Sequence, residues 1–435
     1  MRKLLIQLIV LGSMTFVGMS VHAKEVPLQQ LIDETPANGV LKLEGKTYEG
    51  NVIIDKPITI TGQKGTHIKG DKTKTVIEID SDSVTLDMMH VSGSGMDQSS
   101  HEEYSGIRVI GKHAVLKNIS ITDVFHGIFL SRADGTTIDH ARIVGQNSAS
   151  LAKQGNGIHI VRANDNVIKN SFIEKTRDGI YVEYSNGNKI TNNHVTKTRY
   201  GLHYMYSDDN EFHDNDFVGN VGGAAIMQSD SLLLENNNFS FNQGSRSFGL
   251  IVQTSREVHV LNNKFYQNQR GLYLEQSTSN TMEGNEFFHN QIGIELWTSS
   301  TSQVFFDNIF SKNNTNAVTI GGESFNEWFK NGKGNYWDEP MLDLDRDGFG
   351  DEPYEYRSTI GELLQENELA YLFLSSPAIH IYERANSLLG NQEVMTLDKY
   401  PRMANGNMHY TPIWSAILII TAVSVFVYVR KRRRA

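Results

Sequence analysis

Histidine and methionine residues recur at matching places along this chain. His203 and Met205 lie two residues apart, Met227 follows Met205 by 22 residues, and His159 precedes His203 by twice that interval. Imidazole nitrogen and thioether sulfur, without thiolate, form a ligand set that suits copper, above all Cu(I). The sequence therefore predicts a copper site built from these four residues. The alternative is that they are ordinary surface residues.

A second group of candidate ligands lies nearer the C-terminus. Alternate carboxylates at Asp343, Asp345 and Asp347 are followed by a glycine, and Asp351 comes four residues after Asp347. This spacing matches the first half of a calcium-binding loop. The twelfth position, where an EF-hand has glutamate, is Tyr354. We therefore expect a calcium loop outside an EF-hand, with an ion-free acidic turn as the alternative.

A repeat of 22 residues must position the copper candidates. Glycines recur at this interval, and each opens a Gly-apolar-x-apolar stretch, at Gly157, Gly179, Gly201 and Gly223 and again at Gly249, Gly271 and Gly293. The alternation indicates a strand with one buried face, and so strict a repeat must stack to bury that face. The predicted fold class is all-β: a right-handed parallel β-helix of about 22 residues per coil, spanning residues 24–335.

Counting from each glycine sorts the side chains of a coil. The core receives the residue eleven positions after the glycine: Ile138, Ile168, Ile190, Phe212, Leu234, Val260, Met282 and Val304. An asparagine follows the glycine by fourteen positions in five coils, at Asn193, Asn215, Asn237, Asn263 and Asn285, and predicts a ladder of stacked amides. Residues two and four positions after the glycine face away from the core. Because neighbouring strands are about 4.8 Å apart, we expect Met205 and Met227 side by side, with His203 next to Met205.

The flanking segments predict a cap, a tail and membrane-targeting signals. Residues 27–34 are expected to form a short N-terminal cap helix, residues 336–356 an Asp-rich loop, and residues 357–405 a helical tail. Residues 1–23 have the pattern of a signal peptide. Residues 411–429 are uncharged and long enough for one transmembrane helix, and the basic residues 430–435 are expected on its cytoplasmic side.

Composition narrows the class of function. The formal net charge is −10, and about −17 remains on the external part once the basic leader and tail are set aside, which argues against a nucleic-acid partner. The absence of cysteine excludes disulfides and thiolate metal sites. Many extracellular β-helices act on polysaccharides, but no outward column pairs carboxylates on adjacent rungs as such catalysis requires. We therefore expect a non-catalytic protein, with a carbohydrate-binding or carbohydrate-active protein of the lyase or epimerase kind as the alternative.

Three segments, together with the repeat, resemble the NosD family. They are YGLHYMYSDDN at residues 200–210, the stretch from GNYW to GDEPY at residues 334–354, and SPAIHIYERANSLL at residues 376–389. NosD is the periplasmic β-helix protein of nitrous-oxide reductase maturation. The resemblance implies a role in assembling the copper–sulfide centre of that reductase. It also implies partnership with an ABC transporter (ATPase NosF, permease NosY) and the copper chaperone NosL, with the helical tail docking on the permease.

One feature departs from that family. Its members usually carry no membrane span besides the signal, whereas this chain adds residues 411–434. We therefore expect a periplasmic rod held at the inner membrane by its own C-terminal helix.

Overall fold

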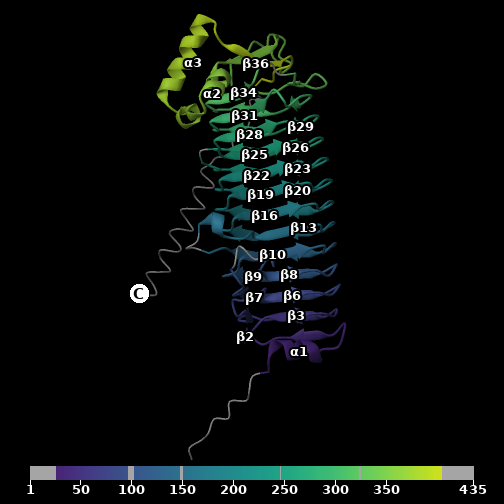
Figure 1. Cartoon of the computed structure of the whole chain (residues 1–435). Helices are drawn as coiled ribbons and strands as arrows, with labels where there is room; N and C mark the ends of the chain where they lie inside the picture. The colour runs from purple at the N-terminus through teal and green to yellow at the C-terminus, as the bar shows by residue number, and fades with distance from the viewer. Residues whose placement is uncertain (1–25, 97–101, 147–149, 245, 323–324, 404–435) are drawn as a thin grey trace, which may run out of the picture.

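The chain folds into a rod of stacked β-coils with a small subdomain at its C-terminal end (Figure 1). The computed structural model describes residues 26–96, 102–146, 150–244, 246–322 and 325–403. Each coil contributes strands that pair in parallel with those of the coils before and after it, in about 12 turns. The predicted parallel β-helix is therefore confirmed, while its right-handed sense stays a prediction.

One side of the rod is a sheet of twelve parallel strands. Its strands in order are β3 (Val52–Ile54), β6 (Ile77–Ile79), β8 (Ser105–Val109), β10 (His126–Ser131), β13 (Ile158–Val161), β16 (Asp178–Glu183), β19 (Tyr200–Met205), β22 (Gly222–Met227), β25 (Phe248–Gln253), β28 (Arg270–Glu275), β31 (Ile292–Trp297) and β34 (Thr315–Ile320). The glycine-led stretches of the sequence lie on these strands.

The remaining sides form a second sheet of 22 strands. One run comprises β1 (Val40–Lys42), β4 (Thr59–Thr61), β11 (Thr137–Asp139), β14 (Val167–Lys169), β17 (Lys189–Thr191), β20 (Glu211–His213), β23 (Leu233–Glu235), β26 (His259–Leu261), β29 (Thr281–Glu283) and β32 (Val304–Phe306). The other comprises β2 (Thr47–Glu49), β5 (His67–Lys69), β12 (Arg142–Val144), β15 (Phe172–Glu174), β18 (His194–Thr196), β21 (Asp216–Val218), β24 (Asn238–Ser240), β27 (Lys264–Tyr266), β30 (Glu286–Phe288) and β33 (Ile309–Ser311). The long strands β7 (Thr85–Ser92) and β9 (Val115–Thr122) belong to both runs and join them.

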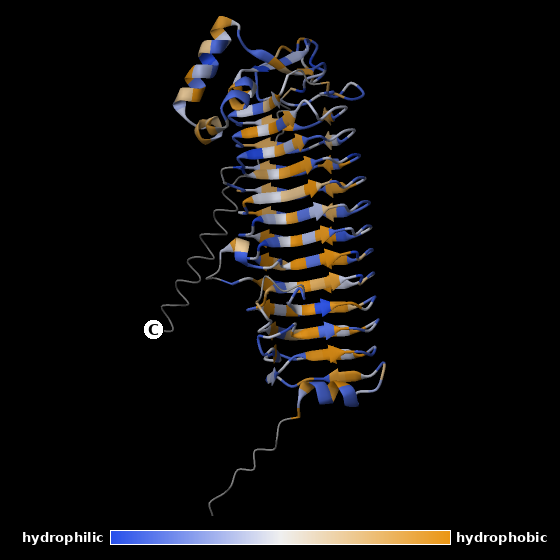
Figure 2. Ribbon diagram, viewed as in Figure 1, coloured by the Kyte–Doolittle hydropathy of each residue, from blue (hydrophilic) through white to orange (hydrophobic). Residues whose placement is uncertain are grey.

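The core contains columns of like side chains stacked one rung apart. Figure 2 shows apolar residues along the strands and polar residues at the turns. Phenylalanine rings stack at 4.7–5.5 Å between centroids along Phe217, Phe239, Phe265, Phe287 and Phe310, and Trp337 ends the column. The predicted core column is confirmed except at its last member. Met282 pairs with Phe305, so Phe305 is buried and Val304 faces outward, because the last coil is one residue longer.

Buried amides form ladders along the rod axis. The predicted ladder is confirmed, with Nδ2 to Oδ1 hydrogen bonds of 2.9–3.1 Å from Asn193 through Asn285, and it continues to Asn308 and Asn335. A second ladder, not predicted from the sequence, runs through Asn242, Asn268, Asn290 and Asn313. Each amide also donates to a backbone carbonyl or accepts from a backbone N–H, so the turns of successive coils are held in register.

Both ends of the rod are covered. Helix α1 (Leu28–Glu34) buries Leu28 and Ile32 at the first coil, as predicted. The tail is only partly helical, which corrects the expectation for residues 357–405. It contains α2 (Ile360–Glu366), the 3-10 helix η2 (Glu368–Phe373) and α3 (Pro377–Leu389), but β36 (Glu393–Asp398) returns to pair antiparallel with β35 (Tyr354–Ser358). The return is fixed by Asp398, which accepts hydrogen bonds from the backbone N–H of Asn335 and the indole of Trp337.

The predicted signal peptide (residues 1–23), transmembrane segment (residues 411–429) and basic tail (residues 430–435) lie outside the described residues. Among the described residues, no helix has both the length and the apolar character needed to cross a bilayer.

Candidate functional site

The outward face of the twelve-stranded sheet holds the predicted copper residues. The column two positions after each glycine is in register, through Arg108, Phe129, His159, Tyr181, His203, Ala225, Ile251, Tyr273, Glu295 and Val318. Its members nevertheless are largely buried, His159 at 7% and His203 at 8% exposure. Larger neighbours on the same face, such as Tyr200 and Phe248, pack over the column. The two histidines are therefore not ordinary surface residues.

His203 is held by a buried carboxylate on the preceding rung. Its Nδ1 lies 3.1 Å from Oδ2 of Asp178, a residue that is 2% exposed. Arg199 donates two hydrogen bonds to the same carboxylate, from Nε to Oδ1 at 2.8 Å and from Nη2 to Oδ2 at 2.5 Å. Burial by itself raises the pKa of Asp178, but hydrogen bonds from His203 and Arg199 outweigh burial and hold the pKa below its ordinary value. An ionised carboxylate at Nδ1 keeps the proton there and leaves the Nε2 lone pair available.

Met205 lies on the same strand as His203, and Met227 is its neighbour on the next rung, as predicted. They are register partners on β19 and β22, and both side chains are half-buried. The hydroxyl of Tyr181 donates to Oε2 of Glu183 (3.0 Å) and lies 3.7 Å from Sδ of Met205. Met227 packs against the apolar cluster of Ala225, Phe248, Ile251 and Tyr273. The structure thus brings one imidazole and two thioethers to one patch of the face.

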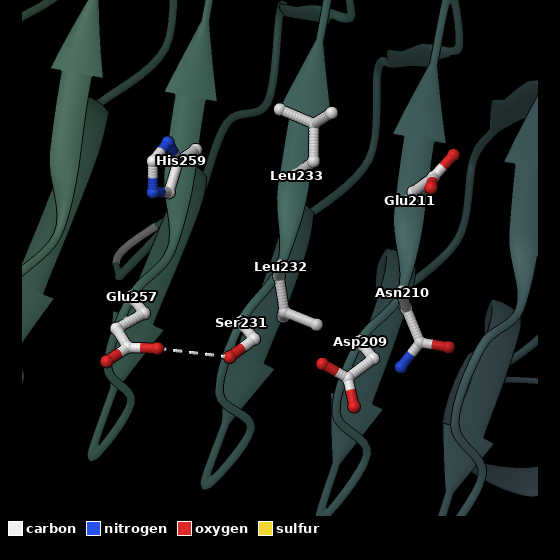
Figure 3. Close-up of a pocket in the computed structure, with 8 residues that line it drawn as sticks. All are labelled: Asp209, Asn210, Glu211, Ser231, Leu232, Leu233, Glu257 and His259. Carbon is white, nitrogen blue, oxygen red and sulfur yellow. Dashed lines mark hydrogen bonds between the residues drawn. The ribbon is translucent and has the colours of Figure 1, made fainter.

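A separate depression of about 420 Å³ lies at the turns of the larger sheet (Figure 3). Its lining residues precede or begin β20, β23 and β26, and they are Asp209, Asn210, Glu211, Ser231, Leu232, Leu233, Glu257 and His259. Ser231 donates to Glu257 on the adjacent rung at 3.2 Å. None of the predicted copper or calcium residues lines this depression.

His159 does not belong with the other three copper candidates. Tyr181 lies between His159 and His203, with its ring centroid 4.7 Å from each imidazole. Two rungs separate the histidines, or about 9.6 Å, so one ion cannot contact both. The predicted four-residue set is therefore wrong as a single site, because stacking places an aromatic ring inside it.

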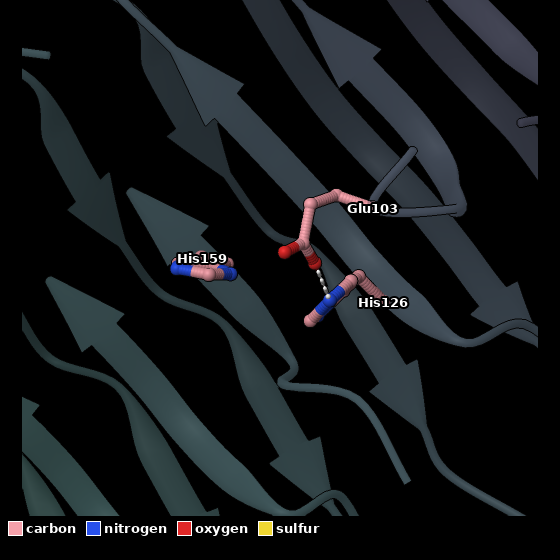
Figure 4. Close-up of side chains that lie close together, drawn as sticks. All are labelled: Glu103, His126 and His159. Carbon is pink, nitrogen blue, oxygen red and sulfur yellow. Dashed lines mark hydrogen bonds and ion pairs between the residues drawn. The ribbon is translucent and has the colours of Figure 1, made fainter. Parts of the chain in front are cut away.

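His159 instead lies beside Glu103 and His126 (Figure 4). One donor atom from each residue lies within 4.8 Å of the other two. His126 Nε2 contacts Glu103 Oε2 at 2.7 Å, and His126 Nδ1 accepts the backbone N–H of Asn156 at 2.9 Å. Both ring nitrogens of His159 have no hydrogen-bond partner among the described residues. Burial lowers the pKa of His159 well below its ordinary value, so the ring is neutral.

Sequence reasoning missed Glu103 and His126. Glu103 precedes β8 in a non-repeating loop, where no period could mark it. His126 directly precedes Gly127, in the outward column that also holds Asp178 and Tyr200. That column, read one position before each glycine, would have been the available signal.

The Asp-rich segment brings together three of its four predicted ligands. Carboxylate oxygens of Asp343, Asp345 and Asp351 lie within 4.8 Å of one another. The Asp347 side chain lies outside that group and accepts the backbone N–H of Phe349 at 2.9 Å. Only a three-carboxylate arrangement therefore matches the calcium prediction.

The tail meets the same outward column near the C-terminal end of the rod. Tyr371 of η2 donates to Oε1 of Glu295 at 2.8 Å, and Arg270 Nη1 lies 3.5 Å from that oxygen. Burial raises the pKa of Glu295, which is 1% exposed. A buried polar contact thus links η2 to the face that carries His203 four rungs away.

Similarity to solved structures supports the fold. The catalytic unit of an α-1,3-glucanase from Streptomyces thermodiastaticus is 14% identical, with a TM-score of 0.58 over 74% of this chain and 68% of that chain. The A-module of the mannuronan C-5 epimerase AlgE6 from Azotobacter vinelandii is 11% identical, with a TM-score of 0.55 over 72% of this chain and 94% of that chain. At such low identities these likenesses speak for the β-helix alone.

Sequence comparison supports the family. Residues 145–342 match the NosD family, described as "Periplasmic copper-binding protein (NosD)". A Pseudomonas aeruginosa protein named "Probable ABC transporter binding protein NosD" is 25% identical over 155 residues, 36% of each chain. The match thus spans about a third of that relative. The resemblance noted in the sequence is thus confirmed over the central coils, where this β-helix chain is similar to the NosD family.

Proposed function

We propose that this chain is an accessory protein for assembly of the copper–sulfur centre of nitrous-oxide reductase. The single observation that supports this role is the patch of His203, Met205 and Met227, with His203 oriented by Asp178. One imidazole and two thioethers favour Cu(I) over harder cations. Since the patch lacks thiolate and is half-buried, it suits a metal that is received and passed on.

The tail supplies a surface that fits docking on an integral membrane partner. Helix α3 buries none of its residues, and it lies beside the end of the rod (Figure 1). Large apolar side chains of η2 and α3 are more than half exposed, at Leu369, Leu372, Phe373, Ile381, Leu388 and Leu389. So much exposed apolar surface on a short segment is typical of an interaction site. We propose the permease NosY as its partner, with the ATPase NosF behind it.

The proposal includes delivery and anchoring. The copper chaperone NosL would load the patch, and the reductase would receive the metal. Residues 411–429 would hold the rod at the periplasmic side of the inner membrane. Motion of the transporter would reach the patch through η2, whose Tyr371 contacts Glu295 of the same column.

The test uses cells that lack this gene and express either the wild-type chain or the double variant His203→Ala/Met205→Ala. We expect reductase purified from the double-variant cells to contain less copper than reductase from wild-type cells. The matched control is His194→Ala, which removes an exposed histidine from β18 on the other sheet. Full copper occupancy with a folded double variant would contradict the role of the patch.

A second candidate function rests on the Asp178–His203 pair. A carboxylate at Nδ1 of a histidine also suits a general base, and epimerases and glycanases share this fold. Incubating the purified chain with alginate, polygalacturonate and α-1,3-glucan tests this alternative. Product formation that is lost in His203→Ala would favour an enzyme, whereas unchanged polymers would favour the accessory role.

A further inference from the structure

We propose that Glu103, His126 and His159 form a second metal site, which takes a divalent first-row cation such as Zn²⁺. Its residues come from the loop before β8, from the start of β10 and from β13, and their donor atoms lie within 4.8 Å of one another (Figure 4). This site is distinct from the patch of His203, Met205 and Met227. The inference does not depend on the proposed function.

His159 supplies the strongest argument for a ligand here. The ring is 7% exposed, and both nitrogens lack a hydrogen-bond partner in the described part of the chain. Buried polar atoms in folded proteins are nearly always satisfied, because an unmet buried donor or acceptor is costly. A cation beside His159 would accept the lone pair of one nitrogen.

Two aromatic side chains pack against the imidazole of His159 and fix its position. Phe129 meets His159 edge-on with centroids 5.0 Å apart, and Tyr181 packs on the other side at 4.7 Å. The ring of His126 lies 5.2 Å from that of His159. Ligands fixed by packing lose little freedom when a metal binds, which strengthens binding.

Glu103 and His126 complete the ligand set. Since Nδ1 of His126 accepts from Asn156, its proton is on Nε2 and is donated to Glu103. A cation between these groups replaces that proton at Nε2, and the ring keeps one proton by taking it on Nδ1 in exchange for the bond from Asn156. The Glu103 side chain is 43% exposed, so the site has an entry path and room for a water ligand.

The donor types decide the class of ion. Two imidazoles and one carboxylate, without sulfur, suit Zn²⁺, Co²⁺ or Cu²⁺ rather than Cu(I). Ligand atoms about 2.0–2.1 Å from a tetrahedral zinc are about 3.3 Å apart, so the group must contract by at most about 1.5 Å. Glu103 lies on a loop, so its carboxylate can move toward the ion without a change in the strands.

The test is titration of the purified full-length chain with Co²⁺ and with Zn²⁺. We expect visible cobalt absorption typical of a tetrahedral nitrogen–oxygen site, reversed by Zn²⁺. Glu103→Gln keeps the side-chain shape on an exposed loop and should weaken Co²⁺ binding at least about tenfold. His159→Phe, which copies Phe129 on the adjacent rung, should abolish the cobalt spectrum.

Met205→Leu is the matched control, because it alters the other patch and leaves these three ligands intact. Its cobalt titration should equal that of the wild type. Wild-type Co²⁺ affinity and spectrum in both Glu103→Gln and His159→Phe would overturn the proposal. If circular dichroism shows that His159→Phe is unfolded, the result for Glu103→Gln decides by itself, since that side chain is not needed for the core.

Discussion

Replacing Asp178 by asparagine tests how His203 is oriented. The carboxylate accepts four hydrogen bonds: Oδ2 from Arg199 Nη2 and His203 Nδ1, and Oδ1 from Arg199 Nε and the backbone N–H of Tyr200. Asparagine has only one acceptor oxygen. In Asp178→Asn an NH₂ group must therefore face donors on one side, so that either His203 or Arg199 Nε loses its partner. In both orientations the negative charge that holds the proton on Nδ1 of His203 is lost.

The expected loss of Cu(I) affinity follows from that geometry. A hydrogen bond to a charged group contributes about 1.5–3 kcal/mol. Removing the partner of a metal-binding histidine weakens metal binding about 10- to 100-fold, or about 1.4–2.7 kcal/mol, and the two ranges agree. Folding should suffer less than at a fully buried ion pair, because the Arg199 side chain is 35% exposed and water can solvate it.

The assay is competition for Cu(I) between the purified chain and a chromophoric chelator under anaerobic conditions. We expect Asp178→Asn to bind Cu(I) about 10- to 100-fold more weakly than the wild type at neutral pH. Asp216→Asn is the matched control. It alters another aspartate that contacts a histidine, His194 at 3.5 Å, but on the larger sheet.

Two results would contradict this role of Asp178. A folded Asp178→Asn with wild-type Cu(I) affinity would mean that the carboxylate does not orient a copper ligand. An equal loss in Asp216→Asn would mean that the assay reports general destabilisation. Thermal melts of both variants separate loss of fold from loss of metal.

Three further outcomes follow from the packing and electrostatics. Phe265→Ala should lower the free energy of unfolding by about 3–5 kcal/mol, because it opens a cavity within the stack of phenylalanine rings. Urea titration measures this change, and a loss below about 1 kcal/mol would contradict the packing of that stack. Because burial raises the pKa of Glu295, its ionisation opposes folding as the pH rises above 4.5, the value of an unperturbed glutamate. Glu295→Gln, which still accepts from Tyr371, should therefore gain stability relative to wild type as the pH rises above that value, and a difference that stays constant with pH would argue against it. Asp345→Asn should weaken calcium binding in calorimetry whereas Asp347→Asn should not, and equal effects would exclude the three-carboxylate arrangement.

Much of the rod could be predicted because its core repeats with the chain. The glycine period places Ile180, Leu202 and Ala224 on one inward column and His203 on an outward one. Where one coil is longer, the count fails: Phe305 rather than Val304 reaches the core. The 22-residue spacing does not reveal this one-residue shift, because the residue that enters the core is selected by burial and not by its distance from the glycine.

The candidate sites could be predicted only in part. Met205 and Met227 become neighbours by the period alone. Arg199 reaches Asp178 through a long side chain at a turn, and Glu103 reaches His126 from a loop of its own. These contacts depend on side-chain length and loop path, which carry no periodic signal.

The coil, its inward and outward columns and the amide ladder follow from the sequence alone, because a strict repeat buries its apolar face by stacking. The contacts and burial of the outward side chains depend instead on the folded arrangement of the whole rod. There Tyr181 separates His159 from His203, Asp178 orients one histidine, and Glu103 and His126 surround the other. The physical reason is that loops and large side chains cover the face, so burial, and with it the chemistry of each imidazole, is set by residues far away in the chain.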